Sequence, residues 1–228
     1  NIDSLYYYFI KIMYSYKIVS YSTKYENNPY VIYNVFKDLI IYSDGYNIKE
    51  IKIIDLKNMD LGKTIENDSL NKYTTYKVGG KAKLIIYPDN LQKLLELLKY
   101  IKDNDIKYFI IGNGSNLLFS SKEFDGVIIK LSNLCDVKIF DDEVYVEAGY
   151  PIIKLCMLCA DNNLGNLEFA SGIPATVGGA ICSNAGAYKM EMSDIVESVT
   201  VIDKDLNIVT LLKDDLKFAY RDSIFKED

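Results

Sequence analysis

The stretch FASGIPATVGGAICSNAGAY (169–188) carries almost no charge and consists largely of glycine and other small residues. So little polarity does not suit a solvated loop, and so little side-chain volume does not fill a core. We therefore expect something large and flat to pack on this segment, because glycine lets another molecule approach the backbone closely. Close packing against a neighbouring helix is the alternative. The residues concerned are Gly172, Gly178, Gly179 and Gly186, with Thr176 and Asn184 as hydrogen-bonding side chains.

A second glycine-containing segment, IIGNGSNLLF (110–119), directly follows an apolar run of strand length. Gly112 and Gly114 leave backbone N–H groups open to a ligand, and Ser115 and Asn116 add polar side chains. This combination suits a diphosphate group. A tight turn between two strands is an equal alternative, and the third glycine of the dinucleotide-binding fingerprint is missing.

The segments before and after this loop alternate between strand and helix patterns. Short apolar runs predict strands at 83–88, 107–112 and 126–131. Between the first two strands, NLQKLLELLKYIKD (90–103) has helical periodicity, so a strand–helix–strand unit that buries its apolar runs is expected. The apolar stripe predicted for this helix consists of Leu91, Leu94, Leu95, Leu98 and Ile101.

The second half of the chain predicts hairpins together with a helix. Alternating runs on either side of a polar turn predict β-hairpins at 137–149 and 198–212. PIIKLCMLCADNNL (151–164) shows helical spacing directly after a proline, a residue that suits the first turn of a helix. This mixture of helices, hairpins and other strands indicates an α+β fold.

Three parts of the chain are expected. Residues 1–55 show no clean periodicity and are expected to form an N-terminal extension of unknown structure. Residues 56–131 and 132–228 are expected to form two subdomains, divided after the third predicted strand.

The charge and the apolar pattern of the chain argue against two classes of partner. With 26 basic and 32 acidic residues the net charge is −6, which does not suit a nucleic-acid-binding protein. The apolar segment 5–22 is interrupted by Lys11 and Lys17, so no membrane span is expected.

The cysteines predict a reducing compartment and no metal site. All four lie in mainly apolar surroundings, which favours free thiols in the cytoplasm over a disulfide framework. Cys156 and Cys159 share one face of the predicted helix, and the sequence contains no histidine to complete a metal site with them. We therefore expect both to be core residues.

Arg221, within FAYRDSIFKED (218–228), is the only arginine of the sequence. Lysine, which supplies every other basic side chain, cannot make a planar, bidentate contact with a carboxylate. Arg221 is therefore a candidate for carboxylate binding. Chance survival of one arginine and structural pairing with Asp222 are the alternatives.

Four stretches of the chain, in this order, resemble the MurB-type UDP-N-acetylenolpyruvoylglucosamine reductases. They lie at 61–88, 110–131, 166–203 and 218–226, and so extend over most of residues 61–226. The resemblance implies the two-subdomain FAD-binding fold of the vanillyl-alcohol-oxidase type, here without the family's third, substrate-binding domain.

The resemblance also implies a reaction. A hydride passes from NADPH to FAD and then to the enolpyruvyl double bond of UDP-N-acetylglucosamine enolpyruvate, which yields UDP-N-acetylmuramate for peptidoglycan precursor synthesis. By the same resemblance Tyr220 and Arg221 bind the substrate, and Arg221 is the catalytic residue that holds its carboxylate.

The cofactor-binding residues follow from the resemblance position by position. GNGSN (112–116) is implied to wrap the diphosphate of FAD, and SGIPATVGGA (171–180) to lie along the flavin and its phosphates. The full implied set is Gly112, Asn113, Gly114, Ser115, Asn116, Leu117, Ser171, Gly172, Ile173, Pro174, Thr176, Val177, Gly178, Gly179, Asn184, Gly186, Ala187 and Tyr188.

The chain departs from the family at some positions. Ala175 stands where the family usually has glycine, and Tyr73 where it often has histidine or asparagine; both changes are expected to be tolerated. The family's proton-donating serine and assisting glutamate belong to the third domain, so we expect this chain to be a fragment. A flavin-binding remnant without turnover, and a non-catalytic interaction protein using the tyrosine-rich extension, are the other interpretations.

Overall fold

The computed structural model describes residues 20–22, 31–33, 53 and 55–226. The chain divides into two units, Asn1–Asp55 and Leu56–Asp228. In the first unit, β1 (Ser20–Ser22) pairs antiparallel with β2 (Val31–Tyr33). Most of the predicted N-terminal extension lies outside the described residues, and the three-part division of the chain stays a prediction.

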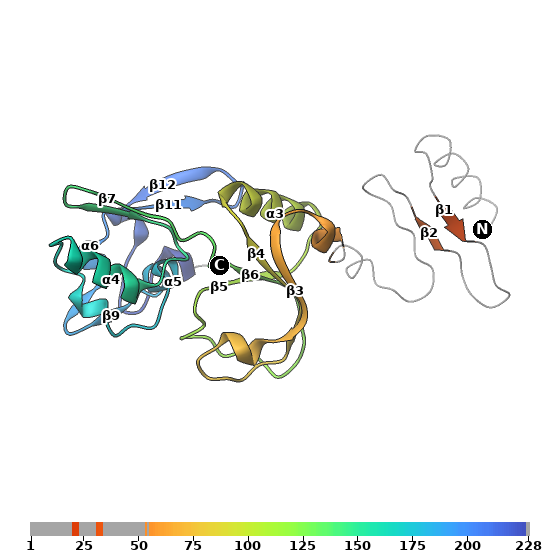
Figure 1. Cartoon of the computed structure of the whole chain (residues 1–228), viewed down its shortest axis with the longest axis horizontal. Helices are drawn as coiled ribbons and strands as arrows, with labels where there is room; N and C mark the ends of the chain where they lie inside the picture. Colours follow the sequence, from red (N-terminus) through yellow and green to blue (C-terminus); the bar gives the residue numbers. More distant parts are fainter. Residues whose placement is uncertain (1–19, 23–30, 34–52, 54, 227–228) are drawn as a thin grey trace. The chain divides into compact units, whose positions relative to one another are not determined.

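The second unit begins with a four-stranded mixed sheet in the order β3-β4-β6-β5 (Figure 1). β3 runs antiparallel to β4, whereas β4 and β5 each pair in parallel with β6. The helix α3 connects β4 to β5 and packs against β4. The bounds are β3 (Gly62–Ser69), β4 (Lys81–Pro88), α3 (Leu91–Asp103), β5 (Tyr108–Ile111) and β6 (Phe124–Lys130), with a short 3-10 helix η1 (Leu70–Tyr73) after β3.

The two central strands form the core of this sheet. The runs Leu84–Ile86 in β4 and Val127–Ile129 in β6 are almost completely buried. Continuous burial of successive residues means that both faces of the strands are covered, as is usual for parallel pairs. The predicted strands at 83–88 and 126–131 are therefore confirmed, and β3 adds an antiparallel edge that the apolar pattern did not predict.

Burial on the neighbouring elements differs from the prediction in two places. The face that α3 buries is Leu94, Leu97, Leu98 and Ile101, which is the i, i+3, i+4, i+7 pattern of a single helical stripe. Leu91, predicted to be part of that stripe, is 41% exposed. Strand β5 lies at the sheet edge and buries only Ile111, so the prediction that the whole run 107–112 is buried was wrong.

The second half is formed by hairpins and short helices around a separate core. Its buried centre includes Ile152, Leu155, Phe169, Val177 and Met192, together with Cys156 and Cys159, which confirms the core role predicted for these two thiols. The bounds are β7 (Val137–Phe140), β8 (Glu143–Val146), α4 (Ile152–Asp161), η2 (Glu168–Ala170), α5 (Val177–Cys182), β9 (Gly186–Ala187), β10 (Met190–Glu191), α6 (Met192–Ile195), β11 (Ser198–Ile202), β12 (Ile208–Leu212), η3 (Lys213–Leu216) and η4 (Ile224–Lys226).

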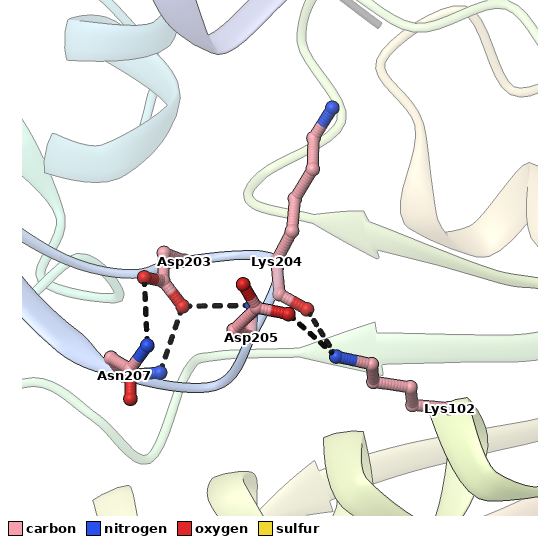
Figure 2. A network of polar contacts seen from close by, with 5 residues as sticks. All are labelled: Lys102, Asp203, Lys204, Asp205 and Asn207. Atoms are coloured by element: carbon pink, nitrogen blue, oxygen red, sulfur yellow. Dashed lines mark hydrogen bonds and ion pairs between the residues drawn. The ribbon is translucent and has the colours of Figure 1, made fainter.

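A polar network ties the β11–β12 turn to the end of α3 (Figure 2). Lys102 Nζ donates to the Lys204 carbonyl oxygen at 2.7 Å and to the Asp205 carboxylate at 3.2 Å. Within the turn, the Asp203 carboxylate accepts from the backbone N–H groups of Asn207 and Asp205, which together with the Asn207 amide lowers its pKa. These hydrogen bonds fix the shape of the turn and connect it to α3.

The predicted α+β class and both predicted hairpins are confirmed. None of the helices in the described ranges has both the length and the apolar character that crossing a membrane requires.

Core truncation in the central sheet is expected to destabilise the fold strongly. Ile128 is fully buried in β6, so Ile128→Ala should lower the free energy of unfolding by about 2–5 kcal/mol. Ile208, which is 51% exposed in β12, serves as the matched control, and Ile208→Ala should cost less than about 1 kcal/mol. Urea unfolding followed by circular dichroism measures both, and equal losses would contradict this assignment of the core.

Candidate functional site

An open cleft runs between the sheet and the hairpin half of the second unit. On one side it is lined by β5 and the loop 112–117, and on the other by β8 and the segment 175–179. The two glycine-containing segments that the sequence singles out therefore border the same cleft. They also touch: Asn113 Nδ2 donates to the Pro174 carbonyl oxygen at 3.4 Å.

The loop 112–117 leaves the end of β5 and is anchored through its carbonyl groups. The Gly112 carbonyl accepts from Lys130 Nζ at 2.6 Å, and the Gly114 carbonyl accepts from the Thr75 N–H at 3.1 Å. Gly114 has φ +66°, and a Cβ at this position would overlap the Tyr73 carbonyl oxygen. Only glycine fits there without strain.

Most backbone N–H groups of this loop have no acceptor among the residues that the structure describes. In the described part of the chain, the N–H groups of Asn113, Ser115, Asn116 and Leu117 make no hydrogen bond, although all four residues border the cleft. Consecutive free N–H groups on a turn with a left-handed residue form a concave site for an anion. Of the two interpretations of this stretch, ligand binding has the better support.

Lys130, Tyr73 and Asp68 lie beside the loop. Lys130 is only 9% exposed, and burial lowers the pKa of its ammonium group. Its Nζ lies 5.9 Å from the centre of the Tyr73 ring, whose hydroxyl donates to Asp68 at 2.7 Å. Hydrogen bonds from Lys72 and Tyr73 lower the pKa of Asp68 to about 2, while burial and Asp68 raise the pKa of Tyr73.

The glycines of 169–188 divide between the two roles predicted for them. A Cβ on Gly178 would lie 2.8 Å from the Ala148 Cβ, and one on Gly186 would lie 2.6 Å from the Met190 carbonyl oxygen. These two glycines therefore allow close packing within the protein. A Cβ on Gly179 would meet only Thr176 Oγ1 at 3.4 Å, so this glycine leaves space for a ligand in the cleft. One on Gly172 would meet no atom within 4 Å, but Gly172 does not border the cleft.

Asn184 is buried and its side chain is fully used within the protein. Its amide donates to Glu191 Oε1 at 2.8 Å and to the Ala219 carbonyl at 3.0 Å, and its oxygen accepts from the Ser193 N–H at 3.0 Å. Such a side chain organises its neighbours, above all the turn that begins at Ala219. Cofactor contact by this residue stays a prediction.

Arg221 lies in a tight turn between Ala219 and Asp222, whose N–H and C=O groups bond each other. The residue has φ +57°, an uncommon conformation for a side chain other than glycine. Arg221 Nη2 donates to the Gly186 carbonyl at 3.0 Å, and Lys226 Nζ donates to the Arg221 carbonyl oxygen. Among the described ion pairs none joins Arg221 to Asp222.

The predicted site residues are only partly gathered in the cleft. Those that border it are Gly112, Asn113, Gly114, Ser115, Asn116, Leu117, Ile173, Thr176, Val177, Gly178, Gly179 and Arg221. Those that do not are Ser171, Gly172, Pro174, Asn184, Gly186, Ala187, Tyr188 and Tyr220. Tyr188 and Tyr220 are each 87% exposed in turns, so their rings project into solvent. In the described part of the chain, no cluster of side chains is suited to hold a metal ion.

Reasoning from the sequence missed Lys130 and Thr75, which anchor the loop. The sequence indicated that Lys130 is unusual, because it is the single charged residue in the otherwise apolar run GVIIKL (126–131). Nothing in the sequence indicated Thr75, because it contributes its backbone N–H and not its side chain.

Comparison with known proteins shows which proteins the chain resembles. Residues 82–212, which include the loop, α5 and both predicted hairpins, match the family model described as FAD binding domain. The chain is 43% identical to the UDP-N-acetylenolpyruvoylglucosamine reductase of Caldicellulosiruptor saccharolyticus over 72% of this chain and 53% of that protein. The chain thus spans about half the length of this curated relative.

Solved structures agree as well. The UDP-N-acetylenolpyruvylglucosamine reductase (MurB) from Thermus caldophilus is 30% identical, with a TM-score of 0.58 over 71% of this chain and 56% of that one. CrmK, a flavoenzyme of caerulomycin biosynthesis, is 18% identical with a TM-score of 0.52 over 68% of this chain and 34% of that one, which shows a shared fold alone.

These matches confirm the predicted resemblance, the predicted two-subdomain flavoprotein fold and FAD as the cofactor. The chain belongs to the FAD binding domain family.

Proposed function

We propose that this chain is the FAD-binding part of a reductase that converts UDP-N-acetylglucosamine enolpyruvate to UDP-N-acetylmuramate with NADPH. The observation that carries the proposal is the cleft: it is bordered both by the loop 112–117, with its free N–H groups, and by the segment 175–179, in a chain 43% identical to such a reductase. The product is a peptidoglycan precursor, and the expected location is the cytoplasm.

The described residues fit the proposed cofactor. The N–H groups of Asn113 and Ser115 to Leu117 suit the negative charge of a diphosphate, and Gly114 gives the loop the left-handed turn that exposes them. Gly179 leaves open space beside Thr176 for the planar part of a ligand. When bound, FAD would supply the hydride transfer, and the protein's part is to orient the reactants.

Arg221 is proposed to hold the substrate's carboxylate. One of its guanidinium nitrogens is fixed on the Gly186 carbonyl, which orients the planar group and leaves its other N–H donors for an anion. Arrival of a hydride at the terminal carbon of the enolpyruvyl group leaves negative charge on the carbon beside the carboxylate. A fixed guanidinium stabilises that charge more strongly in the transition state than in the ground state.

Turnover tests the whole proposal. The purified protein should be yellow from bound FAD, and it should oxidise more than one equivalent of NADPH per flavin only when UDP-N-acetylglucosamine enolpyruvate is present. Bound FAD without substrate-dependent oxidation would favour the alternative, a flavin-binding protein without turnover. Colourless protein that stays colourless after FAD is added would reject the proposal.

Gly114→Ala is expected to raise the Kd for FAD by at least about tenfold. The added Cβ overlaps the Tyr73 carbonyl, and φ +66° strains any residue with a side chain, at a cost of about 1–3 kcal/mol. Gly165→Ala is the control, because its Cβ would meet only the end of the Glu168 side chain at 3.4 Å. Flavin fluorescence titration measures both Kd values, and equal affinities would refute the loop assignment.

Arg221→Lys is expected to raise the Kd for UDP-N-acetylglucosamine enolpyruvate about tenfold or more, because lysine loses the bidentate geometry. The Kd for FAD should change less than about twofold. Perturbation of the flavin absorbance during substrate titration reports the first. Because Arg221→Lys keeps the positive charge, its effect reports the geometry of the guanidinium, and Lys154→Met, at an exposed position on α4, should leave both Kd values unchanged. An unchanged substrate Kd would remove Arg221 from the site.

A further inference from the structure

We propose that Lys130 is a positioning residue for the diphosphate of FAD: its ammonium group holds the Gly112 carbonyl away from the cleft and so aims the neighbouring N–H at the ligand. This inference rests on the proposed role of the loop 112–117 in FAD binding. It assigns Lys130 a role in the site although Lys130 does not border the cleft.

The position of Lys130 follows from strand register. Lys130 ends β6 and pairs with Ile111, which ends β5, so its side chain starts beside the residue that precedes Gly112. Parallel strands bring their carboxyl ends to one edge of the sheet, where the loop begins. The lysine stem thus reaches the first carbonyl of the loop without any bend in the backbone.

The planarity of the peptide bond lets the contact between Lys130 and the Gly112 carbonyl fix the direction of a neighbouring N–H group. A trans peptide is planar, and its C=O and N–H point in opposite directions. Because the Gly112 carbonyl points at Lys130, the Asn113 N–H points away from it; because the Gly114 carbonyl points at the Thr75 N–H, the Ser115 N–H points away from that residue. Neither N–H has an acceptor among the described residues, so both remain available to an anion.

The charge of Lys130 supports the same role. A buried ammonium group is costly unless it is paired, and Lys130 takes part in none of the described ion pairs. Its partners among the described residues are a neutral carbonyl and the face of the Tyr73 ring, while Asp68 accepts hydrogen bonds from Tyr73 and Lys72 instead. A diphosphate on the loop would supply the missing negative charge at short range.

A purely structural lysine and a positioning lysine predict different ligand dependences. Loss of a structural lysine weakens the binding of every ligand in the cleft, because the whole loop is disturbed. Loss of a positioning lysine weakens the binding of ligands that carry a phosphate. It leaves the binding of a flavin without phosphate unchanged. FAD and riboflavin, which lacks phosphate, are the matched probes.

The test uses Lys130→Met, which keeps the length of the stem and removes both charge and donor. The Kd for FAD should rise at least about tenfold, and the Kd for riboflavin should change less than about twofold. Lys83→Met is the control: Lys83 is a partly buried lysine of the same sheet, paired with Asp125, and its loss should leave both Kd values unchanged.

A second variant keeps the proposal testable if Lys130→Met does not fold. Lys130→Gln loses the charge but keeps an N–H donor, on a side chain one bond shorter, so its FAD affinity should fall between those of the wild type and Lys130→Met, with riboflavin affinity again unchanged. An equal loss for both ligands, or an FAD affinity within twofold of the wild type, would overturn the inference. Absence of FAD binding by the wild-type protein would instead reject the proposed function.

Discussion

The parallel pairing of β5 and β6 is the interaction on which the candidate site depends. It aligns Ile111 with Lys130, so that the loop 112–117 and the lysine that anchors it begin at the same sheet edge. The pairing is stabilised by the almost completely buried runs of β4 and β6. The position of the loop therefore depends on hydrophobic burial in the neighbouring strands.

A second constraint comes from the glycine segment 169–188, which serves packing and ligand access at once. Gly178 lets α5 approach Ala148, and this approach brings Thr176 against the start of the loop 112–117. Gly186 lets β9 lie close to β10, and its carbonyl then fixes Arg221. The same glycine therefore serves both the packing of β9 on β10 and the orientation of Arg221.

Local patterns predicted the elements of this fold well and their burial less well. The hairpins at β7–β8 and β11–β12 and the helix α4 follow from alternation and from helical spacing, which depend on neighbours in sequence. The exposure of Tyr108 to Ile110 did not follow, because an apolar run reads the same in a central strand and in an edge strand that borders a cleft. Of the loop's anchors, Lys130 had only a weak signal and Thr75 had none.

The sequence by itself determined the α+β class, the two glycine segments as candidates for ligand binding, and Arg221 as the candidate for carboxylate binding. Each of these rests on residue types and on local spacing. Only the tertiary structure decided which glycines pack against protein, which predicted residues border the cleft, and that Asn184 serves the turn at Ala219. These features depend on contacts between residues far apart in the chain, and no local pattern encodes the direction in which a backbone carbonyl or N–H points once those contacts form.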